Sequence, residues 1–131
     1  MPQSNRPRLA ILGSGRGSNA VALMDGFQSG RLAADLVLVF SNVAGAPILD
    51  RARERQVPTA CIPNAGRTRI EHEAELGELL LLHRVEHLLL AGYMRVLSPS
   101  FVRNFPGHIL NIHPSLLPDF PGAHAVADQW R

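Results

Sequence analysis

The sequence predicts an α/β domain in which a mostly parallel β-sheet carries helices on both faces. Short apolar runs alternate along the chain with longer amphipathic runs, and this alternation is typical of β-α-β units. Most of the short runs, such as DLVLVF and HLLLA, are apolar at nearly every position, which indicates strands buried on both faces. A chain of 131 residues with 46% hydrophobic residues suits one such domain, spanning 1–131, and is too short for two ordinary ones.

The candidate elements follow one another in the order that this fold requires. Strands are expected at 8–12, 35–40, 59–62, 87–91 and 108–113. Helices are expected near 19–28, 47–56 and 68–84, with a shorter helix after Ser98. Pro47 and Pro99 suit a first helical turn, Ser98 suits an N-cap and Gly30 suits a C-terminal stop.

Charge and composition exclude several classes of function. The 13 basic and 11 acidic residues are spread along the chain and leave a net charge of +2, so we expect no nucleic-acid partner and no membrane surface. All the basic residues are Arg, which excludes lysine chemistry such as a Schiff base. There is no signal-peptide pattern and no apolar run of membrane-spanning length, and Cys61 stands alone as a small core residue. These features predict a cytoplasmic protein.

The segment ILGSGRGSN, residues 11–19, places a glycine loop where the first strand turns into the first helix. Glycines let backbone amides approach a ligand, and a helix N-terminus favours an anion, so a phosphate monoester is the first hypothesis. A nucleotide cofactor is a weaker hypothesis, because Ser18 occupies the third glycine position of the dinucleotide pattern. A purely structural turn is the remaining alternative.

The segment HRVEH, residues 83–87, spells a spacing found in one class of zinc peptidase. That chemistry needs both histidines on one face of a continuing helix, together with a further protein ligand. The helical pattern ends near Arg84 and a strand pattern follows, so the context is wrong. We therefore expect no metal.

The segment AGYMRVLSP, residues 91–99, follows the fourth strand at the edge where open α/β sheets bind ligands. Met94, Val96 and Leu97 could form an apolar wall for a flat heterocycle, with backbone amides and carbonyls reading its edge. The alternatives are that Arg95 is only a solvated loop charge and that the stretch is a turn facing the core.

The segment HILNIHPSLLPDFPG, residues 108–122, carries an Asn and a His at alternate positions of an apolar run. Successive side chains of a strand point to opposite faces, so Asn111 and His113 would share one face, roughly 6.6 Å apart along the chain. Pro114 should end the strand there, because it cannot donate to a sheet ladder. The pair is either a functional site at a strand terminus or a solvated edge with a turn-capping Asn.

The motifs SGRGSN, VFSN, LAGYMRVLSPSFV and LNIHPSLLPDFPGAH, in this order, closely resemble those of the folate-dependent formyltransferases. Within that family they resemble the phosphoribosylglycinamide formyltransferase branch of purine biosynthesis. The glycine loop with Ser18 and Asn19 separates this branch from its nearest alternatives, methionyl-tRNA formyltransferase and formyltetrahydrofolate deformylase. The resemblance implies the Rossmann-like formyltransferase fold and runs from the first strand to the last residues given.

The resemblance also implies which residues form the site. The family's phosphate cradle falls on Gly15, Arg16, Gly17, Ser18 and Asn19, its folate contacts fall on Arg69, Met94, Arg95, Val96, Leu97 and Asn111, and its catalytic pair falls on Asn111 and His113. The implied reaction moves a formyl group from 10-formyltetrahydrofolate to the amine of glycinamide ribonucleotide without a metal. The oligomeric state is not implied.

One departure from the family pattern affects the expected activity. The family's third catalytic residue, an Asp, and its last strands lie C-terminal to the residues given, and neither Asp119 nor Asp128 matches the Asp motif. We therefore expect a domain truncated at its C-terminus, with C-terminal strands missing, that transfers formyl groups poorly by itself. A non-catalytic phosphate-binding α/β module remains the alternative to an enzyme.

Overall fold

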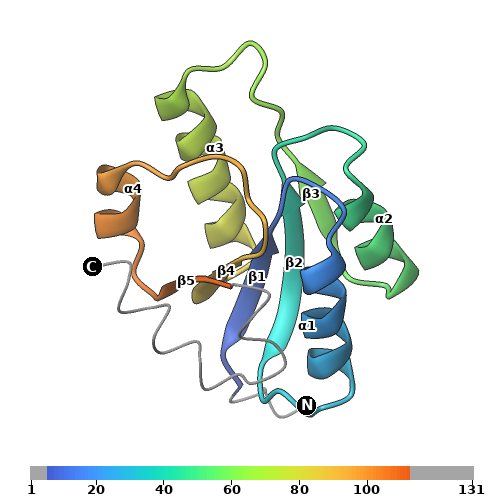
Figure 1. Cartoon of the computed structure of the whole chain (residues 1–131). Helices are drawn as coiled ribbons and strands as arrows, with labels where there is room; N and C mark the ends of the chain where they lie inside the picture. The colour runs from blue at the N-terminus through green and yellow to red at the C-terminus, as the bar shows by residue number, and fades with distance from the viewer. Residues whose placement is uncertain (1–5, 113–131) are drawn as a thin grey trace.

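The sheet of this protein is built from parallel strands that are joined by helices (Figure 1). The computed structural model describes residues 6–112, and residues 1–5 and 113–131 lie outside the described part. The elements in chain order are β1 (Arg8–Leu12), α1 (Ser18–Gln28), β2 (Asp35–Ser41), α2 (Pro47–Glu54), β3 (Thr59–Cys61), α3 (Arg69–Leu82), β4 (His87–Leu90), α4 (Pro99–Asn104) and β5 (Ile109–Asn111). Within these residues the sheet has five strands, and all four pairings are parallel.

The strand order β3-β2-β1-β4-β5 decides where a ligand can bind. The chain moves outward from β1 through β2 to β3, then returns past β1 to β4 and continues outward on the other side. Such a reversal creates a topological switch point between β1 and β4, and open α/β sheets bind ligands outside the carboxyl ends of the strands at this point. The predicted parallel, Rossmann-like fold is confirmed.

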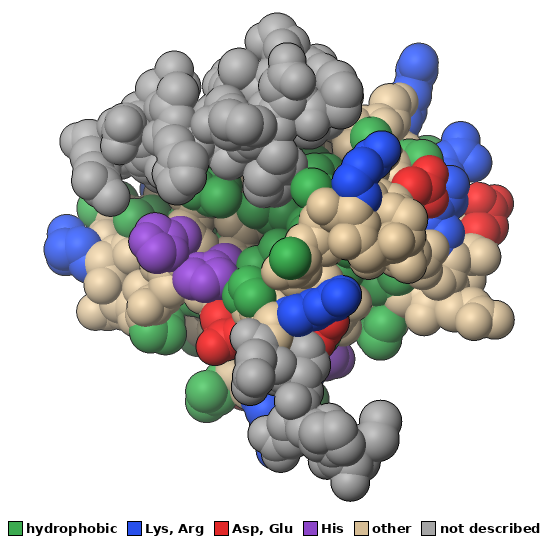
Figure 2. Space-filling view, turned by 90° about the horizontal axis from the view of Figure 1, so that it is seen from below, with side chains coloured by type: hydrophobic (Ala, Val, Ile, Leu, Met, Phe, Trp, Pro, Cys, Tyr) green, Lys and Arg blue, Asp and Glu red, His purple; other side chains and the backbone are tan. Residues whose placement is uncertain are grey.

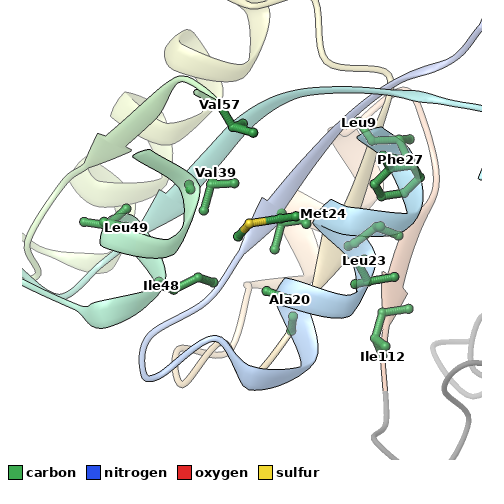
Figure 3. Close-up of a cluster of buried hydrophobic side chains, with 14 of the residues drawn as sticks. Leu9, Ala20, Leu23, Met24, Phe27, Val39, Ile48, Leu49, Val57 and Ile112 are labelled. Atoms are coloured by element: carbon green, nitrogen blue, oxygen red, sulfur yellow. The ribbon is translucent and has the colours of Figure 1, made fainter. Parts of the chain in front are cut away.

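Apolar side chains cover both faces of the sheet, and for this reason the strand sequences show little alternation. On one face α1 and α2 pack against the sheet, with Leu23, Met24 and Ile48 beside Val39 (Figure 3). On the other face α3 and α4 pack against the opposite strand residues, and this second layer contains Phe40, Leu12, Leu38, Leu76, Leu80 and Leu90. Burying each large side chain of this kind contributes about 1.5–3 kcal/mol, so the two layers hold the sheet between the helices.

The helix starts agree with the sequence signals. Pro47 and Pro99 each begin a helix, and the hydroxyl of Ser98 accepts the N–H of Phe101 at 3.1 Å as the N-cap of α4. The start of α3 is held by a capping box, in which Thr68 and Glu71 each accept the other's backbone N–H. Gly30, at φ 81°, follows the C-cap of α1.

The HRVEH segment does not lie on one helix. α3 ends at Leu82, His83 is its C-cap, and Arg84 adopts a positive φ of 55° before β4 begins at His87. The two histidines of the motif therefore belong to different elements. His87 instead contacts His108, which directly precedes β5, and their ring centroids are 5.0 Å apart. Figure 2, which views the molecule from below Figure 1, shows histidine side chains side by side.

Two further sequence expectations concern the burial of Cys61 and the possibility of a membrane-spanning helix. Cys61 is half-buried at the edge of the first apolar layer, and burial raises the pKa of its thiol against the opposing effect of Arg53 and Arg67. Within residues 6–112, no helix combines the length and the apolar character that crossing a membrane requires.

Candidate functional site

The turn between β1 and α1 holds the glycine loop at the carboxyl end of the central strand. Gly17 is the N-cap of α1 and adopts φ 77° and ψ 22°, a left-handed conformation that side chains disfavour. A Cβ on Gly17 would lie 2.8 Å from Cγ1 of Ile48 in α2. A Cβ on Gly15 would meet no atom beyond its chain neighbours within 4 Å. Packing of α1 on α2 thus requires glycine at 17, whereas Gly15 borders open space.

The N-terminus of α1 faces this loop without a side-chain cap. Gly17 has no side chain, and no other side chain of residues 6–112 caps the helix. The carbonyl oxygen of Gly15 accepts the N–H of Ile48 at 3.0 Å, which fastens the loop to α2. Arg16 and Ser18 are exposed and Asn19 is half-buried. The uncapped amides and the positive end of the helix dipole suit a phosphate group.

Residues 91–98 connect β4 to α4 and lie directly beside the glycine loop. The N–H of Ser14 donates to the carbonyl oxygen of Gly92 at 3.1 Å, and the N–H of Met94 donates to Oγ of Ser14 at 2.8 Å. Met94 and Val96 expose 81% and 72% of their surface, whereas Leu97 is 4% exposed in the second apolar layer. The predicted apolar wall is therefore limited to Met94 and Val96, because the side chain of Leu97 belongs to the core.

Two buried polar groups in this connection lack partners within the described residues. They are the hydroxyl of Tyr93 and Nε of Arg95. Burial raises the pKa of Tyr93 to about 12, so its hydroxyl keeps its proton at neutral pH. Arg95 is half-buried rather than a fully solvated loop charge. Buried polar groups of this kind are usually satisfied by water or a ligand.

The end of the same connection is fastened to α3. The carboxylate of Glu73 accepts the N–H of Ser98 at 2.8 Å and its Oγ–H at 2.6 Å. Arg69 is exposed in the first turn of α3, on the same helix one turn before Glu73. Arg69 therefore lies at the N-terminal end of α3, close to Glu73, which binds the end of the 91–98 connection.

Asn111 lies at the carboxyl end of β5. Asn111 pairs in register with Leu90 of β4, which pairs in turn with Leu12 of β1, so the three residues form a row across the sheet. By strand alternation the half-buried Asn111 shares a face with Ile109 of the second layer, whereas Ile112 packs in the first layer. His113, predicted to act with Asn111, lies outside the described residues.

Sequence reasoning missed the polar residues that join these segments. Ser14 and Asn42 are only 7% and 5% exposed, and Oγ of Ser14 donates to Oδ1 of Asn42 at 2.5 Å. Both residues were visible in the motifs SGRGSN and VFSN, at the ends of β1 and β2. Two neighbouring parallel strands that both end in small polar residues would have indicated such a contact, because their carboxyl ends meet at one edge.

Comparisons with known proteins agree with this geometry. The sequence profile of the family described as formyl transferase matches residues 7–131. The chain is 40% identical over 117 residues to phosphoribosylglycinamide formyltransferase of Escherichia coli (strain K12), covering 88% of this chain and 55% of that protein. It is 45% identical over 122 residues to the trifunctional purine biosynthetic protein adenosine-3 of Drosophila pseudoobscura pseudoobscura, covering 91% of this chain and 9% of that protein.

Among solved structures, glycinamide ribonucleotide transformylase 1 of Symbiobacterium toebii matches with a TM-score of 0.79 and 39% identity, covering 98% of this chain and 60% of that one. The chain thus spans little more than half the length of the Escherichia coli relative. Since the family profile covers all but the first residues, the chain belongs to the formyl transferase family.

Proposed function

We propose that this protein takes part in the transfer of a formyl group from 10-formyltetrahydrofolate to the amine of glycinamide ribonucleotide. The observation that carries the proposal is the contact between the glycine loop and the 91–98 connection at the switch point of the sheet. One loop suits the phosphate of the ribonucleotide, and the other presents exposed apolar side chains to a flat heterocycle. The names of the relatives support the formyl transfer and the ribonucleotide acceptor.

The residues divide into a phosphate site and a folate site. Gly15, Arg16, Gly17, Ser18 and Asn19 would bind the phosphate through the uncapped amides at the start of α1. Arg69, Met94, Arg95, Val96, Leu97 and Asn111 would contact the folate, with Leu97 limited to its backbone because its side chain is buried. The exposure of Met94 and Val96 and the unpartnered Nε of Arg95 fit a ligand in this position.

Asn111 and His113 are the proposed catalytic residues. When the ribonucleotide amine attacks the formyl carbon, negative charge develops on the formyl oxygen. The amide of Asn111 and a protonated His113 can donate hydrogen bonds to that oxygen, and preorganised donors of this kind lower the barrier strongly in a site that excludes water. His113 can also carry a proton between the amine and the leaving group.

Calorimetric titration of the chain with glycinamide ribonucleotide and with a folate analogue tests the proposal. We expect both compounds to bind, and to bind together. Binding of the folate analogue alone would favour an enzyme of the methionyl-tRNA formyltransferase or formyltetrahydrofolate deformylase type. Binding of the ribonucleotide alone would favour a non-catalytic phosphate-binding module, and the proposal would be wrong in either case.

A further inference from the structure

Ser14 joins the ends of three strands through its backbone N–H and its hydroxyl. Its N–H donates to the carbonyl oxygen of Gly92 at 3.1 Å, and its hydroxyl contacts Asn42 at 2.5 Å and Met94 at 2.8 Å. Ser14 follows β1, Asn42 follows β2, and Gly92 and Met94 follow β4. Both Ser14 and Asn42 are buried, so water does not compete freely for the bond between their side chains.

The direction of the two hydroxyl bonds follows from their partners. The N–H of Met94 can only donate, so Oγ of Ser14 must accept from it. The single proton of Ser14 is then left for Oδ1 of Asn42, which accepts it. Asn42 thereby orients the hydroxyl, and the oriented hydroxyl holds the backbone of Met94. Removing the hydroxyl of Ser14 would leave the buried Oδ1 of Asn42 without this donor, and removing the amide of Asn42 would leave the hydroxyl proton without this acceptor.

The location of this link matters because it lies between two loops. Ser14 directly precedes Gly15, where the proposed phosphate loop begins. Met94 is the first exposed apolar side chain of the connection that is proposed to contact the folate. A shift of the Ser14 backbone on phosphate binding would therefore change the position and mobility of Met94. The far end of the same connection is held separately, by Glu73.

We propose that Ser14, oriented by Asn42, is a positioning residue that couples the phosphate loop to the folate-contacting connection. Occupancy of the glycine loop would order residues 94–97, and folate bound there would in return favour phosphate, since coupling between two sites is reciprocal. The inference rests on the proposed function for the identity of both ligands. The link itself rests on the hydrogen bonds of Ser14.

Amide hydrogen exchange and amide chemical shifts of the labelled chain, with inorganic phosphate as the probe, test this coupling. In the parent chain we expect phosphate to shift the amides of residues 15–19 and to slow exchange of the Met94 amide about fivefold or more, within the usual range of such couplings. In Ser14→Ala, phosphate should still shift the amides of residues 15–19, but it should slow exchange of the Met94 amide by less than about twofold. Ser14→Thr, which keeps the hydroxyl, should restore the response.

Controls separate coupling from loss of folding. Ser29→Ala removes a hydroxyl that contacts Gly26 at the opposite end of α1. In this variant phosphate should shift the amides of residues 15–19 and slow exchange of the Met94 amide as it does in the parent chain. If Ser14→Ala does not fold, Asn42→Ala removes only the acceptor that orients the hydroxyl and should weaken the Met94 response. Shifts at 15–19 without any change at Met94 in the parent chain would overturn the coupling and leave the proposed function standing. No saturable shift at 15–19 would refute the phosphate site and the coupling with it.

Discussion

Asn111 is the described residue that is proposed to donate a hydrogen bond to the reacting formyl oxygen. It lies half-buried at the carboxyl end of β5, in register with Leu90 and so next to the connection that contacts the folate in our proposal. Its amide can donate to a developing oxyanion, whereas a leucine of similar shape cannot. The proposed role depends on this donor, which the substitution removes while it keeps a side chain of similar size at the half-buried position.

We expect Asn111→Leu to lower the rate of formyl transfer by roughly 10²- to 10³-fold, the usual effect of removing one oxyanion donor. Ribonucleotide binding should change much less, since the phosphate loop is a separate segment. Steady-state rates and calorimetric affinities check the prediction, measured on a form of the protein that spans the full length of its relatives. A rate within a few-fold of the parent would remove Asn111 from the mechanism.

His87 predicts a pH dependence of stability. Its Nδ1 accepts the N–H of His108 at 3.0 Å, which only the unprotonated nitrogen can do. Burial, and then the neighbouring charge of His108, lower the pKa of His87 below its ordinary value of 6.5, against the effect of Glu86. The unfolded chain therefore binds a proton before the folded chain does, so stability falls as the pH falls below about 6.5.

In His87→Gln an uncharged acceptor replaces the imidazole, and the loss of stability on acidification should become smaller. Urea unfolding at pH 7.5 and pH 5.0, for parent and variant, measures the difference. Titrating groups that do not contact His87 behave alike in both proteins and cancel in the comparison, so the difference reports the His87–His108 pair. An equal or larger loss in the variant would show that the His87 contact does not contribute.

Among the elements, α4 depends most on a polar anchor. It spans only Pro99–Asn104 and none of its residues is fully buried. The carboxylate of Glu73 holds Ser98 through both its N–H and its hydroxyl, and the same hydroxyl caps α4. The helix and the end of the 91–98 connection are thus fixed from α3.

Glu73→Gln leaves a single side-chain oxygen and no charge, and we expect it to lower the free energy of unfolding by about 1–2 kcal/mol, as for a lost hydrogen bond to a charged group. Amide exchange should accelerate more in α4 than in α1. Glu78→Gln, at an exposed position of the same α3, is the matched control and should change little. Equal effects of the two substitutions would contradict the anchor.

The elements themselves could be predicted well from local signals. Apolar runs identify the strands because those strands are buried on both faces, and Pro47, Pro99 and Ser98 mark helix starts because capping is a local interaction. The end of α3 is predicted less accurately: the apolar pattern continues to Arg84, but the helix stops at Leu82 so that Arg84 can turn the chain into β4. The residue at which a helix ends generally depends on the position of the next element in the fold.

At the scale of the whole molecule, the site results from strand order. β4 pairs with β1 on the side opposite β2, so the glycine loop after β1 lies next to the connection that follows β4. This strand order explains why Ser14 contacts Met94, about eighty residues later in the chain. Neither this contact nor the burial of Leu97 could be predicted, because both depend on pairing between distant segments. The sequence motifs identify the glycine loop and the 91–98 connection separately, and the strand order brings the two together.

The glycine loop also offers a selective variant. Gly17→Val would collide with Ile48 and strain a residue at φ 77°, so loss of binding there could reflect damage to the α1–α2 packing. Gly15→Val avoids this, because a side chain at 15 enters open space where the phosphate is proposed to bind. Gly77→Val, on α3 and equally unobstructed, is the control.

The most direct test of the central claim is a titration of the labelled chain with glycinamide ribonucleotide, followed through the amide shifts of every described residue. We predict saturable shifts at residues 15–19, an affinity weakened about tenfold or more by Gly15→Val, which corresponds to about 1.4 kcal/mol, and no change in Gly77→Val. Absence of saturable shifts at 15–19, or unchanged affinity in Gly15→Val, would contradict the assignment of this loop to the substrate phosphate.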